Sequence, residues 1–277
     1  MGKGAYWPME SSTGINLPID TVVIGSGNVA SIVVPALEQS GVIAVRQVYS
    51  PTESHAKGLS ARLNAAEAVS VLEDVADDAR LYLVAVKDDA IAKIAQQMKR
   101  NNAVWLHTSG GVESSTFAPL TDSYGVFYPL QTFSKGVSLD LSKVPVFVQG
   151  SDEKSLSMAR LLGEAISPKV YEADGPMRAK LHAAAVYACN FTNHLWAIAD
   201  DILRREAGVD LSVLYPLLEE TMRKALTMRP AEGQTGPARR GDRGVIEKHK
   251  SLLTTDEANL YEILSQHIID YYEQNKL

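Results

Sequence analysis

The spacing of hydrophobic residues changes character near residue 174. Before that point, short β-branched and apolar runs alternate with stretches of helical spacing. This alternation is typical of a parallel sheet covered by helices on both faces. Strands are predicted at 21–24, 42–49, 68–71, 81–86, 104–107, 125–128, 144–148 and 169–171, and helices at 29–39, 54–63, 90–99 and 153–166.

After Asp174-Gly175-Pro176 the helical period continues without a convincing strand. One long helix is predicted from 177 to 206, ended by Gly208, with further helices at 211–228 and 256–274. The glycine- and proline-rich segment 233–242 predicts a structured loop or a linker. We therefore expect an N-terminal tail (1–18), an α/β domain with a doubly wound, mostly parallel sheet (19–173) and an all-α domain (174–277).

The first predicted strand runs directly into Gly25-x-Gly27-x-x-Ala30 at the start of a helix. In a βαβ unit the first glycine permits a tight turn, the second lets the backbone approach a pyrophosphate, and the small third residue lets the helix pack on the strand. Phosphates would lie on free N–H groups of the helix, although a plain turn without a ligand is the alternative. The residues expected to hold a dinucleotide here are Gly25, Ser26, Gly27, Asn28, Val29 and Ala30.

The end of the second strand favours NADP over NAD. NAD enzymes usually place an acid there to bind the ribose, but no acid lies between residues 38 and 53. The hydroxyls of Ser50 and Thr52 can face a 2′-phosphate without repelling it. The candidate counter-charges are Arg46, His55 and Lys57.

Composition narrows the class of protein. The chain has 277 residues, of which 45% are hydrophobic, and a formal net charge of -6, so nucleic acid is not an expected partner. Residues 1–18 lack a basic-then-apolar pattern and no apolar run is long enough to span a bilayer, which predicts a cytoplasmic protein. The single cysteine, Cys189, excludes an internal disulfide framework and is expected to be a packed core thiol. The histidines are too scattered for a recognised zinc motif, so no metal is assigned.

Ligands of open α/β sheets bind beyond the carboxyl ends of the strands, which places residues 86–89 and 107–110 beside the glycine turn. His107 either faces a nicotinamide or substrate carbonyl, or hydrogen-bonds a neighbouring loop. Asp88 is expected to cap the helix that begins near residue 90. Gln131, after the sixth strand, either contacts a small polar substrate or forms an ordinary turn.

The long helix carries polar groups on an otherwise apolar face. At about 100° per residue, His182 and Asn193 fall on one stripe, with Asn190 about 80° from His182. Buried polar groups need partners, so this face either holds an internal network or lines a cleft. Further along, Arg240 lies in a constrained turn that either holds a carboxylate or phosphate, or is simply an exposed charged turn. His249 either points toward the same site or is solvated.

Separated motifs carry a family resemblance. They are GSGNVA (25–30), VYS (48–50), LVAVKDDAI (83–91), HTSG (107–110), YGVFYPLQTFS (124–134), LHAAAVYACNFTNH (181–194) and TGPARRGD (235–242) followed by His249. The chain resembles a bacterial family of Rossmann-like NADP oxidoreductases whose C-terminal half is a helical domain of unassigned function. That family is similar in architecture to pyrroline-5-carboxylate reductase, coenzyme F420-dependent NADP reductases and the 6-phosphogluconate dehydrogenase superfamily.

The resemblance implies a Rossmann domain joined to a helical, dimer-forming domain, with the active site in the cleft between them. It also implies that Val86 and Lys87 pass along the cofactor, near Ser109. The dehydrogenase superfamily carries a lysine and, about one turn later, an asparagine on its long helix. Here Lys180 is followed one turn on by Ala184, which favours His182 as the general acid.

The predicted function is an NADP-dependent oxidoreductase that moves a hydride between the nicotinamide and a small anionic carbonyl, imine or alcohol in the interdomain cleft of a homodimer. The predicted catalytic residues are His107, His182 and Asn190. The predicted substrate-binding residues are Gln131, Asn193, Arg240 (held by Asp242) and His249. A protein that binds NADP without turnover, as a redox sensor or regulator, is the alternative.

Overall fold

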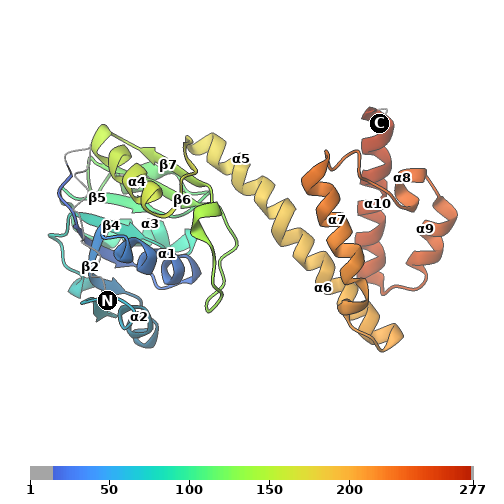
Figure 1. Cartoon of the computed structure of the whole chain (residues 1–277), viewed down its shortest axis with the longest axis horizontal. Helices are drawn as coiled ribbons and strands as arrows, with labels where there is room; N and C mark the ends of the chain where they lie inside the picture. Colours follow the sequence, from blue (N-terminus) through green and yellow to red (C-terminus); the bar gives the residue numbers. More distant parts are fainter. Residues whose placement is uncertain (1–14, 276–277) are drawn as a thin grey trace, which may run out of the picture. The chain divides into compact units, whose positions relative to one another are not determined.

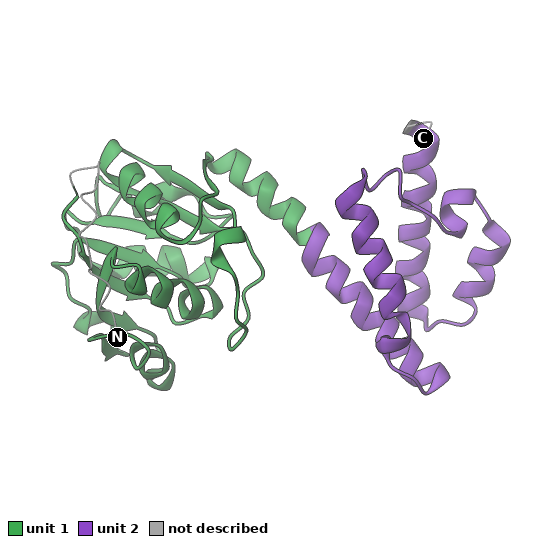
Figure 2. Cartoon of the chain, viewed as in Figure 1, with its two compact units in different colours: residues 1–186 green, residues 187–277 purple. Residues whose placement is uncertain are grey.

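The computed structural model describes residues 15–275. The predicted tail therefore lies mostly outside the described residues. The chain forms two compact units, residues 1–186 and 187–277, which are coloured green and purple in Figure 2. The sequence placed the boundary at residues 173/174, thirteen residues earlier.

The first unit contains one eight-stranded sheet in the order β3-β2-β1-β4-β5-β6-β7-β8 (Figure 1). Only the β6·β7 pair is antiparallel, so the predicted mostly parallel sheet is confirmed. The strands are β1 (Ile19–Ile24), β2 (Ile43–Tyr49), β3 (Glu67–Val69), β4 (Leu81–Val84), β5 (Val104–His107), β6 (Tyr124–Pro129), β7 (Val146–Gly150) and β8 (Val170–Glu172). Their ends differ from the predicted ones by no more than two residues.

Alternating side chains build one core on each face of the sheet. Val23 and Leu83 pack on one side, together with residues of α1 (Asn28–Gln39), α2 (Glu53–Ser60) and α4 (Glu153–Ile166). Val22 and Tyr82, their neighbours along the strands, pack on the other side with α3 (Asp88–Gln97). Successive residues of a strand point to opposite faces, so a strand buried on both faces reads as a continuous apolar run.

Strand register brings the candidate residues to one edge. Ile24 pairs with both Tyr49 and Val84, and Val84 pairs with His107. These residues are the carboxyl ends of β1, β2, β4 and β5. The segments that follow them, including the glycine turn and residues 107–110, therefore begin side by side.

The predicted long helix is helical throughout but is not a regular α-helix. It consists of α5 (Gly175–Ala185), a π-helical segment η4 (Val186–Phe191), α6 (Thr192–Ile202) and a second π-helical segment η5 (Leu203–Ala207). Gly208 ends it in the left-handed conformation at φ +66°, as its position predicted. The α5 segment belongs to the first unit.

After α6, the described residues of the second unit form helices joined by turns and loops, without a strand. Its elements are η6 (Leu211–Leu214), α7 (Tyr215–Thr227), α8 (Pro237–Arg240), α9 (Arg243–Lys250) and α10 (Thr255–Asn275). Ala238, Ile246 and Ile269 form a small core between α8, α9 and α10. The predicted loop at 233–242 thus contains a one-turn helix. Across residues 15–275, no helix combines the length and apolar character needed to cross a membrane.

Candidate nucleotide and active site

The β1–α1 turn packs directly on the end of β4. Gly25 has φ +113°, and a Cβ there would lie 2.3 Å from the Ala85 carbonyl oxygen. The Gly25 N–H donates to Tyr49 O at 2.8 Å, and the Ala85 N–H donates to Ile24 O at 2.7 Å. Both the conformation and the contact therefore require glycine at this position.

The N-terminus of α1 is open to an anion. Gly27 is its N-cap residue, no side chain caps the helix, and the first turn contains no acid. The first N–H groups of a helix have no partner within it and carry a partial positive charge. A Cβ on Gly27 would lie 3.8 Å from the Ala85 oxygen, an ordinary contact, so this glycine is not required by local packing. Its missing side chain instead leaves the N–H groups accessible, which fits a diphosphate.

Ser50 and Thr52 follow β2 at the same edge. Ser50 is buried, and its N–H donates to Val69 O at 3.0 Å. Thr52 is exposed at the N-cap of α2, without a side-chain capping bond. Lys57, one turn into α2, pairs with Glu53 at 2.6 Å on the surface. Both hydroxyl residues lie where a ribose is expected, and Lys57 already has an acidic partner.

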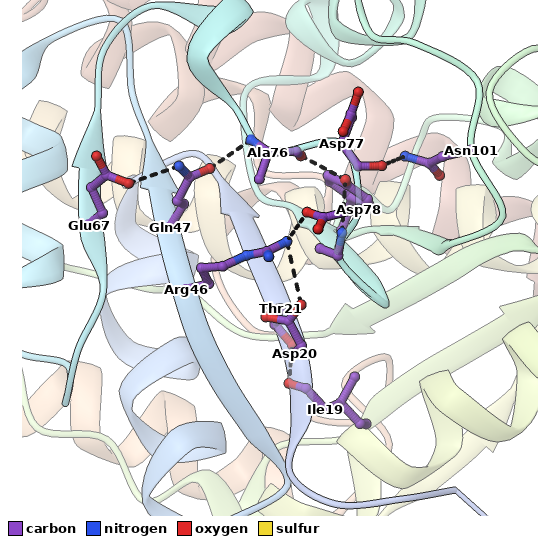
Figure 3. A network of polar contacts seen from close by, with 12 residues as sticks. Ile19, Asp20, Thr21, Arg46, Gln47, Glu67, Ala76, Asp77, Asp78 and Asn101 are labelled. Atoms are coloured by element: carbon purple, nitrogen blue, oxygen red, sulfur yellow. Dashed lines mark hydrogen bonds and ion pairs between the residues drawn. The ribbon is translucent and has the colours of Figure 1, made fainter.

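Arg46 is not available as a counter-charge, contrary to the sequence expectation. Its guanidinium donates to Asp78 Oδ1 at 2.7 Å and lies 3.4 Å from Asp20 Oδ2 (Figure 3). Arg46 stands three residues before the carboxyl end of β2, and its partners lie at the start of β1 and before β4. This ion-pair network therefore belongs to the opposite part of the strands.

Asp88 was expected to cap α3, but it does not. The helix begins at Asp88 itself, and its N-cap position falls on Lys87, without a capping bond. The Asp88 carboxylate approaches Gly111 instead, with Oδ2 3.6 Å from the place of a Cβ on that glycine. Val86 is half-buried and Lys87 is exposed. An acid thus faces the loop after β5.

His107 is fully buried at the end of β5. Its Nδ1 accepts the Ser109 N–H at 3.2 Å, so the ring proton lies on Nε2, which has no hydrogen-bond partner among the described residues. Burial and the positive charge of Arg178 lower the pKa of His107 to about 3, which leaves the ring neutral near pH 7. The sequence left two roles open for His107, namely to face a nicotinamide or substrate carbonyl, or to hydrogen-bond a neighbouring loop. These contacts match the second role.

The loop after His107 is held to α5 by a buried arginine. Ser109 Oγ accepts the N–H groups of Gly111 and Val112, each at 3.1 Å. Arg178, 1% exposed, donates to Val112 O at 2.7 Å and to Gln149 Oε1. This anchor explains why α5 belongs to the sheet unit. This anchor was not predicted from the sequence.

The imidazole of His182 meets a second residue that the sequence analysis missed. Arg178 and His182 are four residues apart and share a face of α5. The hydroxyl of Tyr128, at the end of β6, lies 3.0 Å from His182 Nδ1. His182 is exposed whereas Tyr128 is buried. The position of Tyr128 at a strand end on the ligand edge was the available signal.

The residues after His182 do not form the predicted stripe. The angular placement assumed an uninterrupted α-helix, and η4 changes the number of residues per turn between His182 and Asn193. Cys189 is exposed, so the expected core thiol is wrong. Asn190 and Asn193 are also exposed. The part of the chain described here leaves this helix face uncovered.

Three candidate residues from other segments are Arg240, His249 and Gln131. Arg240 is exposed, and Asp242 caps α9 by accepting the Val245 N–H at 3.2 Å rather than holding Arg240. His249 Nδ1 lies 2.9 Å from the Tyr261 hydroxyl. Gln131, exposed after β6, accepts the Thr132 N–H at 2.8 Å, as in a turn.

Comparison with known proteins identifies the family. A crystal structure of "putative NADP oxidoreductase BF3122" from Bacteroides fragilis is 38% identical, with a TM-score of 0.84 over 91% of this chain and 98% of that one. The chain belongs to the family of BF3122. Residues 8–131 match the Rossmann-like domain, and residues 144–268 match a domain of unknown function, DUF2520.

More distant structures share the fold of this family. A reductive aminase from Aspergillus terreus, in complex with NADPH and ethyl-5-oxohexanoate, is 13% identical, with a TM-score of 0.64 over 92% of this chain and 99% of that one. An imine reductase from Myxococcus stipitatus in complex with NADP+ is 14% identical, with a TM-score of 0.61 over 92% of this chain and 93% of that one. A search of curated proteins found no match.

Proposed function

We propose that this protein is an NADP-dependent oxidoreductase that acts on a small anionic carbonyl, imine or alcohol. The β1–α1 turn carries the proposal, because Gly25 packs on Ala85 and α1 begins without a side-chain cap. The resemblance to BF3122 supports the same cofactor and reaction class. The structures bound to NADPH and NADP+ share the fold.

Each part of the cofactor has candidate partners in this chain. The N–H groups at residues 28–30 would hold the diphosphate, and Ser50 and Thr52 would face the 2′-phosphate. Val86, Lys87 and Ser109 would line the nicotinamide end. When bound, the nicotinamide supplies or accepts the hydride.

His182 is the better candidate of the two histidines for moving the substrate proton. Proton transfer needs a side chain that can reach the reacting atom and change its charge. His107 is buried, and its low pKa keeps it neutral. His182 is exposed, with Nδ1 beside Tyr128, which leaves Nε2 for transfer. Roles for Gln131, Asn190, Asn193, Arg240 and His249 in holding the substrate stay predictions.

Two measurements test this function. Calorimetry should show uptake of NADPH in preference to NADH. A screen of small carbonyl and imine compounds should then show NADPH oxidation that is lost in His182→Ala and kept in His267→Ala, which changes an exposed histidine of α10. Binding of NADPH without oxidation by any compound would favour a sensor instead.

We also propose that a second copy of the chain covers the helical unit. Met222 and Leu226, one turn apart on the same face of α7, are 49% and 79% exposed, and Ile263 of α10 is 66% exposed. Neighbouring exposed apolar side chains of this size favour a contact with another protein. Light scattering should give twice the 30.1 kDa chain mass. The double variant Met222→Asp/Leu226→Asp should be monomeric, whereas Glu219→Gln on the same helix should not. A wild type of single chain mass would contradict the dimer.

A further inference from the structure

Tyr128 and His182 form a side-chain pair that links the sheet to α5. The Tyr128 hydroxyl lies 3.0 Å from His182 Nδ1, and the ring centroids are 6.1 Å apart at an interplanar angle of 70°. Tyr128 is fixed at the carboxyl end of β6, where it pairs with Phe147 of β7. His182 is fixed by Arg178, one turn earlier, whose guanidinium is bound to Val112 and Gln149. Both partners are thus held by well-anchored backbone.

Gly110 leaves the space that this pair needs. A Cβ on Gly110 would lie 2.7 Å from Tyr128 Cζ, 2.8 Å from Tyr128 Oη and 3.0 Å from His182 Cβ. Real Cβ atoms do not approach other atoms so closely, so any larger residue at 110 would displace the tyrosine ring or α5. The loop that follows His107 is therefore shaped around the pair.

The hydroxyl of Tyr128 stays protonated over the physiological range. Burial, with a smaller contribution from the charge of Asp88, raises the pKa of Tyr128 to about 12, and Arg178 opposes this only in part. A phenol O–H both donates and accepts hydrogen bonds. It can donate to Nδ1 of a neutral imidazole that carries its proton on Nε2, and it can accept from Nδ1–H of an imidazolium. In both states Nδ1 is engaged, and Nε2 is the nitrogen left to exchange a proton.

We propose that Tyr128 is a positioning residue that fixes the orientation and tautomer of His182, so that Nε2 is the atom that transfers the substrate proton. This inference rests on the proposed function for the identity of the transferred proton. The tautomer itself is a property of the protein without substrate. Tyr128 was not among the site residues expected from the sequence, and Gly110 was placed at the ligand edge without a role of its own.

The direct test is the tautomer of His182 in the full-length protein. Long-range ¹H–¹⁵N spectra distinguish a ring protonated on Nε2 from one protonated on Nδ1, and His182→Gln assigns the signal. At a pH where the ring is neutral, the wild type should show the Nε2–H form, and Tyr128→Phe should show a mixture of both forms. Tyr124→Phe, on the same strand, is the matched control and should match the wild type. An unchanged Nε2–H form in Tyr128→Phe would overturn the proposal.

Activity provides the second measurement. With a substrate found by the NADPH oxidation screen, Tyr128→Phe should lower kcat about 10- to 100-fold, with little change in KM or in the Kd for NADPH. A kcat equal to that of Tyr124→Phe would also overturn the proposal. A wild type that binds no NADPH refutes the proposed function instead, and the tautomer measurement still decides whether Tyr128 fixes the imidazole.

Discussion

The buried, neutral His107 predicts a specific dependence of stability on pH. Its ordinary pKa is 6.5, and in the folded protein the pKa is about 3 because of burial and the charge of Arg178. Below about pH 6.5 the unfolded chain binds a proton at this residue that the folded chain does not bind. The free energy of unfolding therefore falls as pH decreases, and this loss continues until the folded pKa is reached.

The size of this change in the free energy of unfolding follows from the single proton that His107 binds in the unfolded chain. Each pH unit changes the free energy of unfolding by about 1.4 kcal/mol per proton taken up. Since the unfolded ring is only half-protonated at pH 6.5, the contribution of His107 between pH 6.5 and pH 5.0 is about 1.6 kcal/mol. The variant His107→Asn keeps an acceptor for the Ser109 N–H and removes the titrating ring. The variant is less stable than the wild type at every pH because it loses packing contacts. Its free energy of unfolding does not, however, include the loss on acidification that His107 causes in the wild type.

Urea unfolding at several pH values measures the difference. The wild type should lose about 1.6 kcal/mol more than His107→Asn between pH 6.5 and pH 5.0. His55→Asn changes an exposed histidine and should follow the wild type. Parallel pH profiles for the wild type and His107→Asn would show that His107 titrates normally, and would refute its assignment as a buried, neutral ring.

Three further variants test the site. Arg178→Met should lower the free energy of unfolding by about 1–3 kcal/mol for each of its two acceptors left unpaired, Val112 O and Gln149 Oε1. The control Arg160→Met changes an exposed arginine and should have little effect on the free energy of unfolding. Equal melting temperatures for these two variants would contradict the role of Arg178 as an anchor. Thr52→Asp places a favourable N-cap residue at the start of α2, where Thr52 makes no capping bond, and its carboxylate should raise the Kd for NADPH relative to the Kd for NADH. An unchanged ratio of the two Kd values would contradict a 2′-phosphate at this position. Gly25→Ala should reduce thermal stability sharply because of the Ala85 contact, and a melting temperature equal to that of Gly58→Ala would argue against the tight turn.

Local pattern was sufficient for most of the fold. The bounds of β5 and α4 agree with prediction to the residue, because a buried apolar run and a helical repeat each carry their own period. The glycine turn was also predictable, since its chemistry lies within six consecutive residues. Gly208 was identified as a helix end for the same reason.

Contacts between distant segments were not predictable in this way. Tyr128 and His182 are 54 residues apart, and Arg178 meets Val112 across 66 residues. An arginine at the start of an amphipathic helix reads as solvated unless its buried partners are known. The η4 segment has no sequence signature, and it altered the helical register on which the Asn190 and Asn193 predictions relied. Cys189 was placed in a core because the sequence does not show what covers a helix face.

The proposed NADP-dependent function depends most on binding of a nucleotide diphosphate at the N-terminus of α1. The variant Gly27→Asp tests this directly, because its backbone is extended at φ -71° and a Cβ has ordinary room. The new carboxylate should cap α1 and preserve the melting temperature, yet it would repel a phosphate charge about 5 Å away by about 3 kcal/mol at an effective dielectric constant of 20. Calorimetry should therefore show that the wild type binds NADPH and that Gly27→Asp binds it at least about 100-fold more weakly. Equal affinities, or a wild type that takes up no NADPH at millimolar concentration, would contradict the central claim.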